Sequence, residues 1–181
     1  RLITLERLFQ NIYGKSLYKS ILSIGDNTDR MRFLAEQTER ITGLKEFGIY
    51  LSKLITIDAV FLNEDRHTHN IAVLQDDMGG YHYCPVFDNG AALLSDTSMD
   101  YPMDGNLADL MKDVKPGIIC RDFDEQLDCV EKLYGQHIRF CFGGKEIGQL
   151  SEAEAYYPVA IKQRVQFILL EQRRKYQYLF L

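Results

Sequence analysis

The sequence predicts a mostly α-helical fold with one short β-hairpin, built as a single domain over residues 1–181. Several segments repeat apolar residues at spacings of three and four and end at a glycine, as amphipathic helices do. Two short β-rich segments flank a glycine-containing turn near the middle of the chain. With 181 residues and 46% hydrophobic content, the chain can bury one substantial core but is too short for two full domains.

The first two helices are predicted at residues 2–14 and 26–43. The first ends at Gly14, and the second follows polar cap candidates between residues 26 and 29 and ends at Gly43. The apolar positions that define one buried face are Leu2, Leu5, Leu8, Phe9 and Ile12 in the first helix, and Met31, Leu34, Ala35, Thr38 and Ile41 in the second.

The third predicted helix, residues 44–63, is apolar on nearly every face and is therefore expected inside the protein. Asp58 is the single carboxylate in its apolar part. A carboxylate inside an apolar helix must be paired, so we expect Asp58 to accept hydrogen bonds from the backbone of the polar loop that follows. A catalytic role for Asp58 is the less favoured interpretation.

The β-rich segments, residues 70–75 and 81–88, predict a two-stranded hairpin around the turn at residues 76–80. A loop at residues 98–106 is rich in Pro, Gly and Asp. Helices are predicted beyond it, at residues 122–135 and 151–180.

The start of the last predicted helix carries two signals. Ser151 and Glu154 have the spacing of a capping box. Pro158 must start, kink or delay the helix, because proline lacks the backbone donor. The basic run at residues 173–175 is expected to be a solvated helix end, where positive charge is favourable.

Charge and cysteine content narrow the classes of partner and compartment. The formal net charge of −5 argues against a general preference for nucleic acid or anionic membrane, so neither is expected as a direct partner. The sequence has no signal peptide pattern and no apolar run of membrane-spanning length, and its cysteines lack CxxC spacing, so we expect a cytoplasmic protein. The cysteines are Cys84, Cys120, Cys129 and Cys141.

A candidate site lies where the buried helix meets the hairpin, in the stretch NEDRHTHNIAVL. If the hairpin is antiparallel, Asn70 at the start of one strand and Asp88 at the end of the other meet at the same open end. Two such oxygen ligands suit Mg²⁺, which keeps part of its hydration shell and binds substrate phosphates. Asp65 would then remain free beside the metal to accept a proton from an incoming hydroxyl, which is the arrangement that phosphoryl transfer requires.

The other polar residues of this loop have supporting roles in this hypothesis. Arg66 or His67 would hold the loop in shape or offset carboxylate charge. His67 and His69 could suggest zinc, but two loop histidines without a nearby cysteine make a poor structural zinc site. We therefore expect His67 to brace the loop and His69 to face solvent. The predicted catalytic group is Asp65, Arg66 and His67, and the predicted cofactor and metal ligands are Asn70 and Asp88.

The pattern Asp-Arg-His-x-x-Asn after an apolar helix, followed by a hairpin and Phe-Asp-Asn-Gly, resembles the kinase family typified by the bacterial HipA toxins. The resemblance covers residues 47–94, and it implies a protein-kinase-like C-terminal lobe. By this resemblance Asp65 matches the catalytic base, Asn70 a metal ligand, and Asp88 the metal-binding aspartate of the second kinase motif. Phosphatidylinositol kinases share the first motif more distantly, but they usually have Asp-Phe-Gly where this chain has residues 88–90, which makes a lipid substrate less expected.

The resemblance implies a kinase that uses ATP and Mg²⁺ to phosphorylate a Ser or Thr hydroxyl of a protein. It also implies a toxin–antitoxin or related regulatory role, with a small DNA-binding antitoxin as a partner. The alternatives are a non-catalytic interaction module that retains the motif, and a kinase for a small-molecule hydroxyl.

The nucleotide-binding features of an N-terminal kinase lobe have no match in this sequence. The glycines before residue 50 are too widely spaced for a phosphate-covering loop, and YGKS at residues 13–16 lacks the upstream glycine of a P-loop. The chain begins without methionine, and we expect it to be the C-terminal lobe of a larger kinase, inactive or weakly active by itself.

Overall fold

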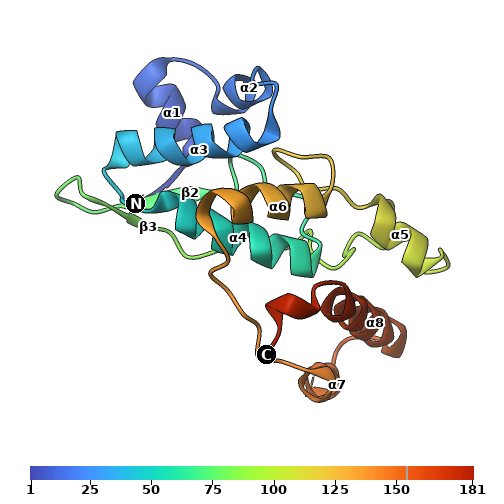
Figure 1. Ribbon diagram of the computed structural model, residues 1–181. Coiled ribbons are helices and arrows are strands. Elements are labelled where there is room, and N and C mark those ends of the chain that lie inside the picture. Colours follow the sequence, from blue (N-terminus) through green and yellow to red (C-terminus); the bar gives the residue numbers. More distant parts are fainter. Residues whose placement is uncertain (154) are drawn as a thin grey trace.

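The computed structural model describes residues 1–153 and 155–181, and it confirms a mostly helical fold with a small sheet (Figure 1). The strands are β1 (Leu2–Thr4), β2 (Ala72–Gln75) and β3 (Tyr81–Tyr83). The helices are α1 (Leu5–Tyr13), α2 (Leu17–Leu22), α3 (Asn27–Thr42), α4 (Phe47–Phe61), α5 (Leu107–Asp113), α6 (Phe123–Tyr134), α7 (Gly144–Ala153) and α8 (Val159–Lys175), with a short 3₁₀ helix at Gln177–Leu179.

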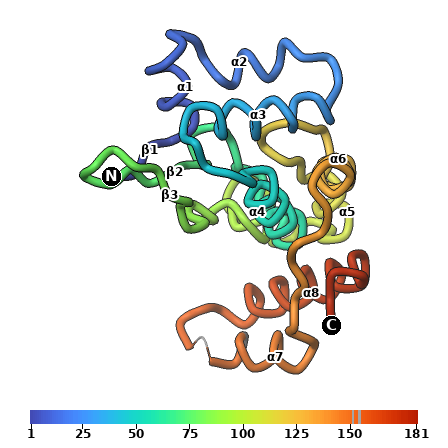
Figure 2. Tube along the Cα trace, turned by 60° about the vertical axis from the view of Figure 1, so that its left-hand side comes forward, coloured from blue at the N-terminus to red at the C-terminus, as the bar shows by residue number. Residues whose placement is uncertain are grey.

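Helix α4 is the centre of the molecule, as its apolar sequence predicts. Figure 2 shows α1, α2 and α3 on one side of it and α7 and α8 on the other. Helices α3, α6 and α8 pack directly against α4. Leu51, Leu54 and Ile55 are at most 1% exposed, and burial of each such side chain contributes roughly 1.5–3 kcal/mol. This helix therefore supplies a rigid floor for the loop that leaves its C-terminal end.

The ends of the early helices follow the sequence signals. The Asp26 side chain accepts a hydrogen bond from the backbone N–H of Asp29 at the start of α3. Gly14 and Gly43 close α1 and α3 in the left-handed backbone region, with φ of 66° and 73°. The predicted start of α3 and the predicted ends of α1 and α3 are therefore confirmed.

The apolar spacing predicted that the first helix begins at Leu2, but the first residues of the chain lie outside that helix. Leu2–Thr4 form strand β1, which pairs antiparallel with β2 in the register Ile3↔Val73. Thr4 ends the strand and caps α1 by accepting from the N–H of Arg7. The free edge of the hairpin supplies the backbone partners, so the sheet has three strands in the order β1-β2-β3 and not two.

The hairpin itself is antiparallel as predicted, with Leu74 opposite His82. Strand β3 is shorter than the predicted segment 81–88, because it ends at Tyr83. Pro85 lacks a backbone N–H and cannot continue the ladder. Residues 84–88 therefore leave the sheet as an irregular segment.

The C-terminal helix is divided differently from the prediction. Ser151 lies within α7 and not at the start of a helix, and the Glu154 half of the expected capping box lies outside the described residues. Pro158 occupies the position before α8, where its missing donor is harmless. Helix α8 ends at Lys175, with the basic run in its last turn as expected. No helix among the described residues is both long and apolar enough to cross a membrane.

Candidate functional site

The candidate site is built on residues 63–71, called here the Asp65 loop, which connects α4 to β2. Helix α4 stops at Leu62, whose backbone is left-handed with φ of 52°. The backbone N–H of Asn63 still donates to the carbonyl oxygen of Asp58, at 2.9 Å. The loop therefore starts from a fixed point at the end of the most buried helix.

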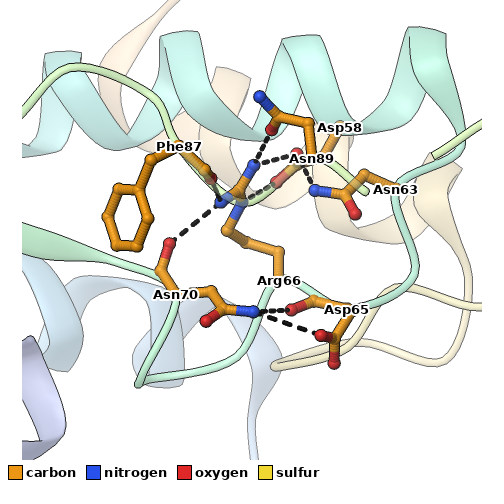
Figure 3. Close-up of polar contacts among 7 residues, drawn as sticks. All are labelled: Asp58, Asn63, Asp65, Arg66, Asn70, Phe87 and Asn89. Atoms are coloured by element: carbon orange, nitrogen blue, oxygen red, sulfur yellow. Dashed lines mark hydrogen bonds and ion pairs between the residues drawn. The ribbon is translucent and has the colours of Figure 1, made fainter. Parts of the chain in front are cut away.

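Arg66 is the internal support of the Asp65 loop. Its side chain is 1% exposed, and each of its five N–H groups has an acceptor (Figure 3). Nε and Nη2 donate to the two carboxylate oxygens of Asp58, at 2.9 and 3.0 Å. Such a two-point contact is the strongest geometry for an arginine–carboxylate pair.

The remaining donors of Arg66 join the two sequence motifs. Nη1 donates to the carbonyl oxygens of both Asn70, at 2.9 Å, and Phe87, at 2.7 Å. Nη2 also donates to the side-chain oxygen of Asn89, at 2.5 Å. Asp88 lies between the two residues that Arg66 holds, so the backbone is fixed on both sides of it. One buried guanidinium thus joins Asn70 to the segment that carries Asp88 (Figure 3). The sequence predicted that strand pairing would do this, but the ladder ends at Tyr83, so the link is made by Arg66.

Asp58 is paired, as its burial requires, but its donors differ from those expected. The sequence suggested backbone N–H groups of the loop, whereas the carboxylate accepts from the side chains of Arg66 and Asn63. The physical reason is that a guanidinium brings both hydrogen bonds and the opposite charge. Burial raises the pKa of Asp58, while the bonds from Arg66 and Asn63 act in the opposite direction. The contacts of Asp58 are those of a residue that positions the loop.

Asp65 is oriented by its neighbours while its carboxylate stays open to solvent. The side-chain amide of Asn70 donates through Nδ2 to the carbonyl of Asp65, at 2.9 Å, and to its carboxylate, at 3.2 Å. His67 Nε2 lies 3.4 Å from the other carboxylate oxygen, and the Asp65 side chain is 53% exposed. The structure therefore brings Asp65, His67 and Asn70 together, with Asp65 accessible to a ligand.

The two histidines lie at the surface of the loop. Nδ1 of His67 accepts from the backbone N–H of His69, at 3.2 Å, so His67 braces the loop as expected. The two rings meet edge to face, with centroids 5.7 Å apart. His69 is exposed, which confirms the expectation that it faces solvent.

Asp88 is held in an unusual backbone conformation. Its φ is 54°, in the left-handed region that non-glycine residues adopt infrequently and that aspartate tolerates better than most. The side chain is exposed and has no hydrogen-bond or ion-pair partner within the described residues. Arg66 maintains this conformation through Phe87 and Asn89. The carboxylate is thereby displayed at the end of the hairpin without an internal partner.

Asn70 and Asp88 each present an oxygen of the kind that hard divalent cations such as Mg²⁺ bind. Because Nδ2 of Asn70 is engaged by Asp65, the opposite end of the amide, Oδ1, is the end available to a metal. The Asp88 carboxylate is unpaired and exposed. Mg²⁺ usually takes only a few protein oxygens and completes its shell with waters and phosphate oxygens, so these two oxygen types suit it chemically.

A second buried carboxylate supports the Asp65 loop from the opposite side. Glu6, in the first turn of α1, is 7% exposed and accepts from the Thr68 hydroxyl and from the N–H of Tyr18, both at 2.9 Å. The N–H of Glu6 also donates to the carbonyl of Thr68, at 3.1 Å. Burial acts to raise the pKa of Glu6, but hydrogen bonds from Ser16, Tyr18 and Thr68 outweigh it and lower that pKa.

The lowered pKa of Glu6 makes its contribution to stability depend on pH. The carboxylate stabilises the folded state above the ordinary pKa of 4.5, and this stabilisation is lost as the pH falls through the lowered folded-state pKa. Glu6→Gln is expected to reduce the free energy of unfolding by about 1–3 kcal/mol at pH 7, and by less at pH 3. Urea unfolding at both pH values checks this, with the exposed residue change Glu36→Gln as control. An equal loss at pH 3 would contradict the assignment.

Gly117 allows a distant segment to lie directly on the Asp65 loop. A Cβ atom at this position would lie 2.6 Å from the carbonyl oxygen of Glu64 and 3.0 Å from the backbone nitrogen of Arg66. Real Cβ atoms do not approach backbone so closely, so only glycine fits without movement. Glu64 is tied further to the same region by the Tyr101 hydroxyl, which donates to its carboxylate.

Gly117→Ala is therefore expected to displace the Asp65 loop and to lower the free energy of unfolding by about 1–3 kcal/mol. Thermal unfolding measures this loss, and amide chemical shifts of residues 64–66 report the displacement. Gly25→Ala is the matched control, because a Cβ at Gly25 meets no atom within 4 Å. If both variants unfold at the same temperature, the close packing of Gly117 is wrong.

Sequence reasoning grouped Asp65, His67, Asn70 and Asp88 in one site. The structure brings the first three together and links the segment of Asp88 to them through Arg66, and sequence reasoning missed several residues that hold them. Asn89 was visible in the second motif, yet its contact with Arg66 depends on how the chain folds back. Glu6 and Gly117 gave no local signal, because their partners lie far along the chain.

Comparison with known proteins adds no family assignment to this geometry. No protein-family model matches the chain, and no curated protein or solved structure matches it either.

Proposed function

We propose that this chain carries the phosphoryl-transfer site of a Mg²⁺- and ATP-dependent kinase of the HipA-like type, within a protein-kinase-like C-terminal lobe. The observation that supports this proposal best is the double contact of Arg66 Nη1 with the carbonyls of Asn70 and Phe87. Through it, Asn70 and the segment that carries Asp88 share one support in Arg66, the residue next to Asp65. If Asn70 and Asp88 were ordinary polar residues of two separate loops, the two loops would not need a common contact with Arg66.

In this proposal Asp65 accepts the proton of the acceptor hydroxyl. Its carboxylate is exposed, and Asn70 and His67 fix its direction. A base that is already aimed reduces the loss of freedom on reaching the transition state. His67 acts as a brace for that carboxylate. Arg66 is a positioning residue, since its N–H groups are all occupied inside the protein.

Asn70 Oδ1 and the Asp88 carboxylate would hold the metal. Mg²⁺, when bound with ATP, offsets the negative charge on the phosphate oxygens. The chain's own part in this proposal is to hold both residues through Arg66, which binds the carbonyl of Asn70 and the residues on either side of Asp88. The strained backbone of Asp88 is kept ready for this by its neighbours, so little rearrangement is needed on binding.

The acceptor in this proposal is a Ser or Thr hydroxyl of a protein, as in the family that the motif resembles. A toxin–antitoxin or regulatory role with a small DNA-binding partner belongs to the same proposal and rests on that resemblance alone.

The proposal is tested first by calorimetric titration of this chain with ATP and Mg²⁺, compared with Asp88→Ala. We expect Mg²⁺-dependent ATP binding that the substitution weakens by about tenfold or more, because one of two charged or polar metal ligands is lost. Asn70→Ala is expected to weaken the dependence on Mg²⁺ in the same direction.

The matched control is Asp77→Asn, which removes one exposed carboxylate from the turn of the same hairpin. It should bind Mg²⁺ and ATP as the unmodified chain does. Equal binding by Asp88→Ala and the unmodified chain would place the metal elsewhere and remove the basis of the proposal.

A further inference from the structure

A cavity of about 450 Å³ that shares no lining residue with the candidate site lies between residues 92–97 and the α7–α8 pair. In Figure 2, α7 and α8 lie on the far side of α4 from the helices at the start of the chain. Most of the cavity lining is apolar, and the volume is in the range of small-molecule sites. The apolar lining residues are Ala92, Leu93, Leu94, Leu150, Tyr157, Ile161 and Val165.

Arg164 lines this cavity and is only partly hydrogen-bonded. The residue is 7% exposed, and Nη1 donates to the carbonyl of Pro102 at 3.3 Å. Its Nε and Nη2 are buried and have no hydrogen-bond partner among the described residues. A buried guanidinium without a carboxylate partner is costly, and such groups in native proteins call for an explanation. Burial also lowers the pKa of Arg164, as expected for a cation without a counter-charge.

The contrast with Arg66 shows how incomplete this environment is. Arg66 is similarly buried, and a carboxylate and three further acceptors satisfy all of its donors. Arg164 has no carboxylate partner within the described part of the chain. A second cation, Lys162, lines the same cavity, and its lining within residues 1–153 and 155–181 includes no carboxylate. The described lining of the cavity therefore combines apolar walls with two basic side chains and no acidic one.

We propose that this cavity binds a small carboxylic acid with an apolar body, such as a medium-chain acyl acid. The apolar walls would hold the body, and the free edge of Arg164 would bind the carboxylate. The buried nitrogens lie under the cavity wall, so binding requires a change of the Arg164 side-chain rotamer, which is common when ligands bind. This inference does not depend on the proposed kinase function.

The unmodified chain allows a first test that needs no substitution. Octanoate, octylammonium and 1-octanol share one alkyl chain and differ only in the charge of the head group. We expect octanoate to bind at least about tenfold more tightly than either of the others, as measured by chemical-shift titration of the amides of residues 92–97 and 159–165. Butanoate should bind more weakly than octanoate, because it buries less apolar surface.

Arg164→Gln should then lower octanoate affinity about tenfold or more and leave 1-octanol affinity nearly unchanged. Arg174→Gln is the matched control, because Arg174 is an exposed arginine on the same helix whose partner is Glu171. If Arg164→Gln does not fold, Leu150→Ala tests the apolar wall, since Leu150 is 61% exposed and its truncation should not affect folding. Leu150→Ala should weaken octanoate severalfold.

Two results would overturn the inference. One is equal affinity for octanoate and octylammonium, which would show that the positive charge of Arg164 does not favour binding of a carboxylate. The other is octanoate binding that shifts amides away from the cavity. Loss of ATP binding in the calorimetric test would leave this inference untouched, because the two sites share no lining residue.

Discussion

Asp65→Asn is expected to lower the rate of phosphoryl transfer by about 10²- to 10⁴-fold in the intact protein, while its unfolding temperature stays within a few degrees. The substitution keeps the size of the side chain and removes the group that accepts the proton. The Asp65 side chain is 53% exposed, and Asn70 Nδ2 can still donate to the backbone carbonyl of residue 65 and to the side-chain oxygen of the substituted asparagine, so the fold does not depend on the charge. Initial rates of γ-phosphate transfer, with thermal unfolding measured alongside, check this result.

The control for Asp65→Asn is His69→Asn, a change at an exposed position of the same loop. It should retain most of the activity, because His69 does not contact the Asp65 carboxylate. Undiminished turnover in both Asp65→Asn and Asp88→Ala would show that the site assignment is wrong. An intact protein that binds Mg²⁺ and ATP but transfers no phosphate would favour the alternative of a non-catalytic interaction module.

Arg66→Met is expected to lower the free energy of unfolding by about 3–5 kcal/mol, the largest loss of stability predicted here. The substitution leaves Asp58 as a buried charge with only Asn63 as a donor. It also deprives the carbonyls of Asn70 and Phe87 of their shared donor. Urea unfolding measures the loss. The control is Arg32→Met, which breaks the exposed ion pair between Arg32 and Asp29 and should lower the free energy of unfolding by less than about 1 kcal/mol.

A double-mutant cycle separates the charge from the hydrogen bonds. Combining Asp58→Asn with Arg66→Met removes the lone buried charge, so the pair should be less destabilised than the sum of the single changes by roughly 1–3 kcal/mol. The carbonyls of Asn70 and Phe87 remain unpaired, so stability should not return to that of the unmodified chain. Additive losses would mean that Asp58 and Arg66 do not act as a unit.

The helices and their ends were predictable because their causes are local. The start of α3 depends on the contact of Asp26 with Asp29, and its end depends on the contact of Gly43 with Glu39. At each end the two partners are only three or four residues apart. The burial of α4 follows from apolar residues on nearly all its faces. The hairpin follows from two β-rich segments and a glycine turn. Asp65, Asn70 and Asp88 were candidates for one site because they stand directly after the apolar helix or at the ends of the β-rich segments.

Local patterns were misleading where a distant partner decided the outcome. Leu2 and Leu5 fit a helical spacing, but the edge of β2 draws residues 2–4 into the sheet. The short helices α2 and α5, of six and seven residues, have too few positions for their periodicity to stand out. Asp58 was correctly expected to be paired, yet its donors could not be named from its neighbours in sequence.

By itself, the sequence determined the positions of α1, α3 and α6, the buried α4, the hairpin, and the polar residues that follow α4 and the hairpin. Only the tertiary structure decided that Arg66 would bind Asp58, Asn70, Phe87 and Asn89 at once, and that Glu6 and Gly117 would support the same loop. The physical reason is that periodicity and capping act over a few residues. Buried polar groups instead take whichever partners the folded chain brings within hydrogen-bonding distance, and leaving one unpaired is costly.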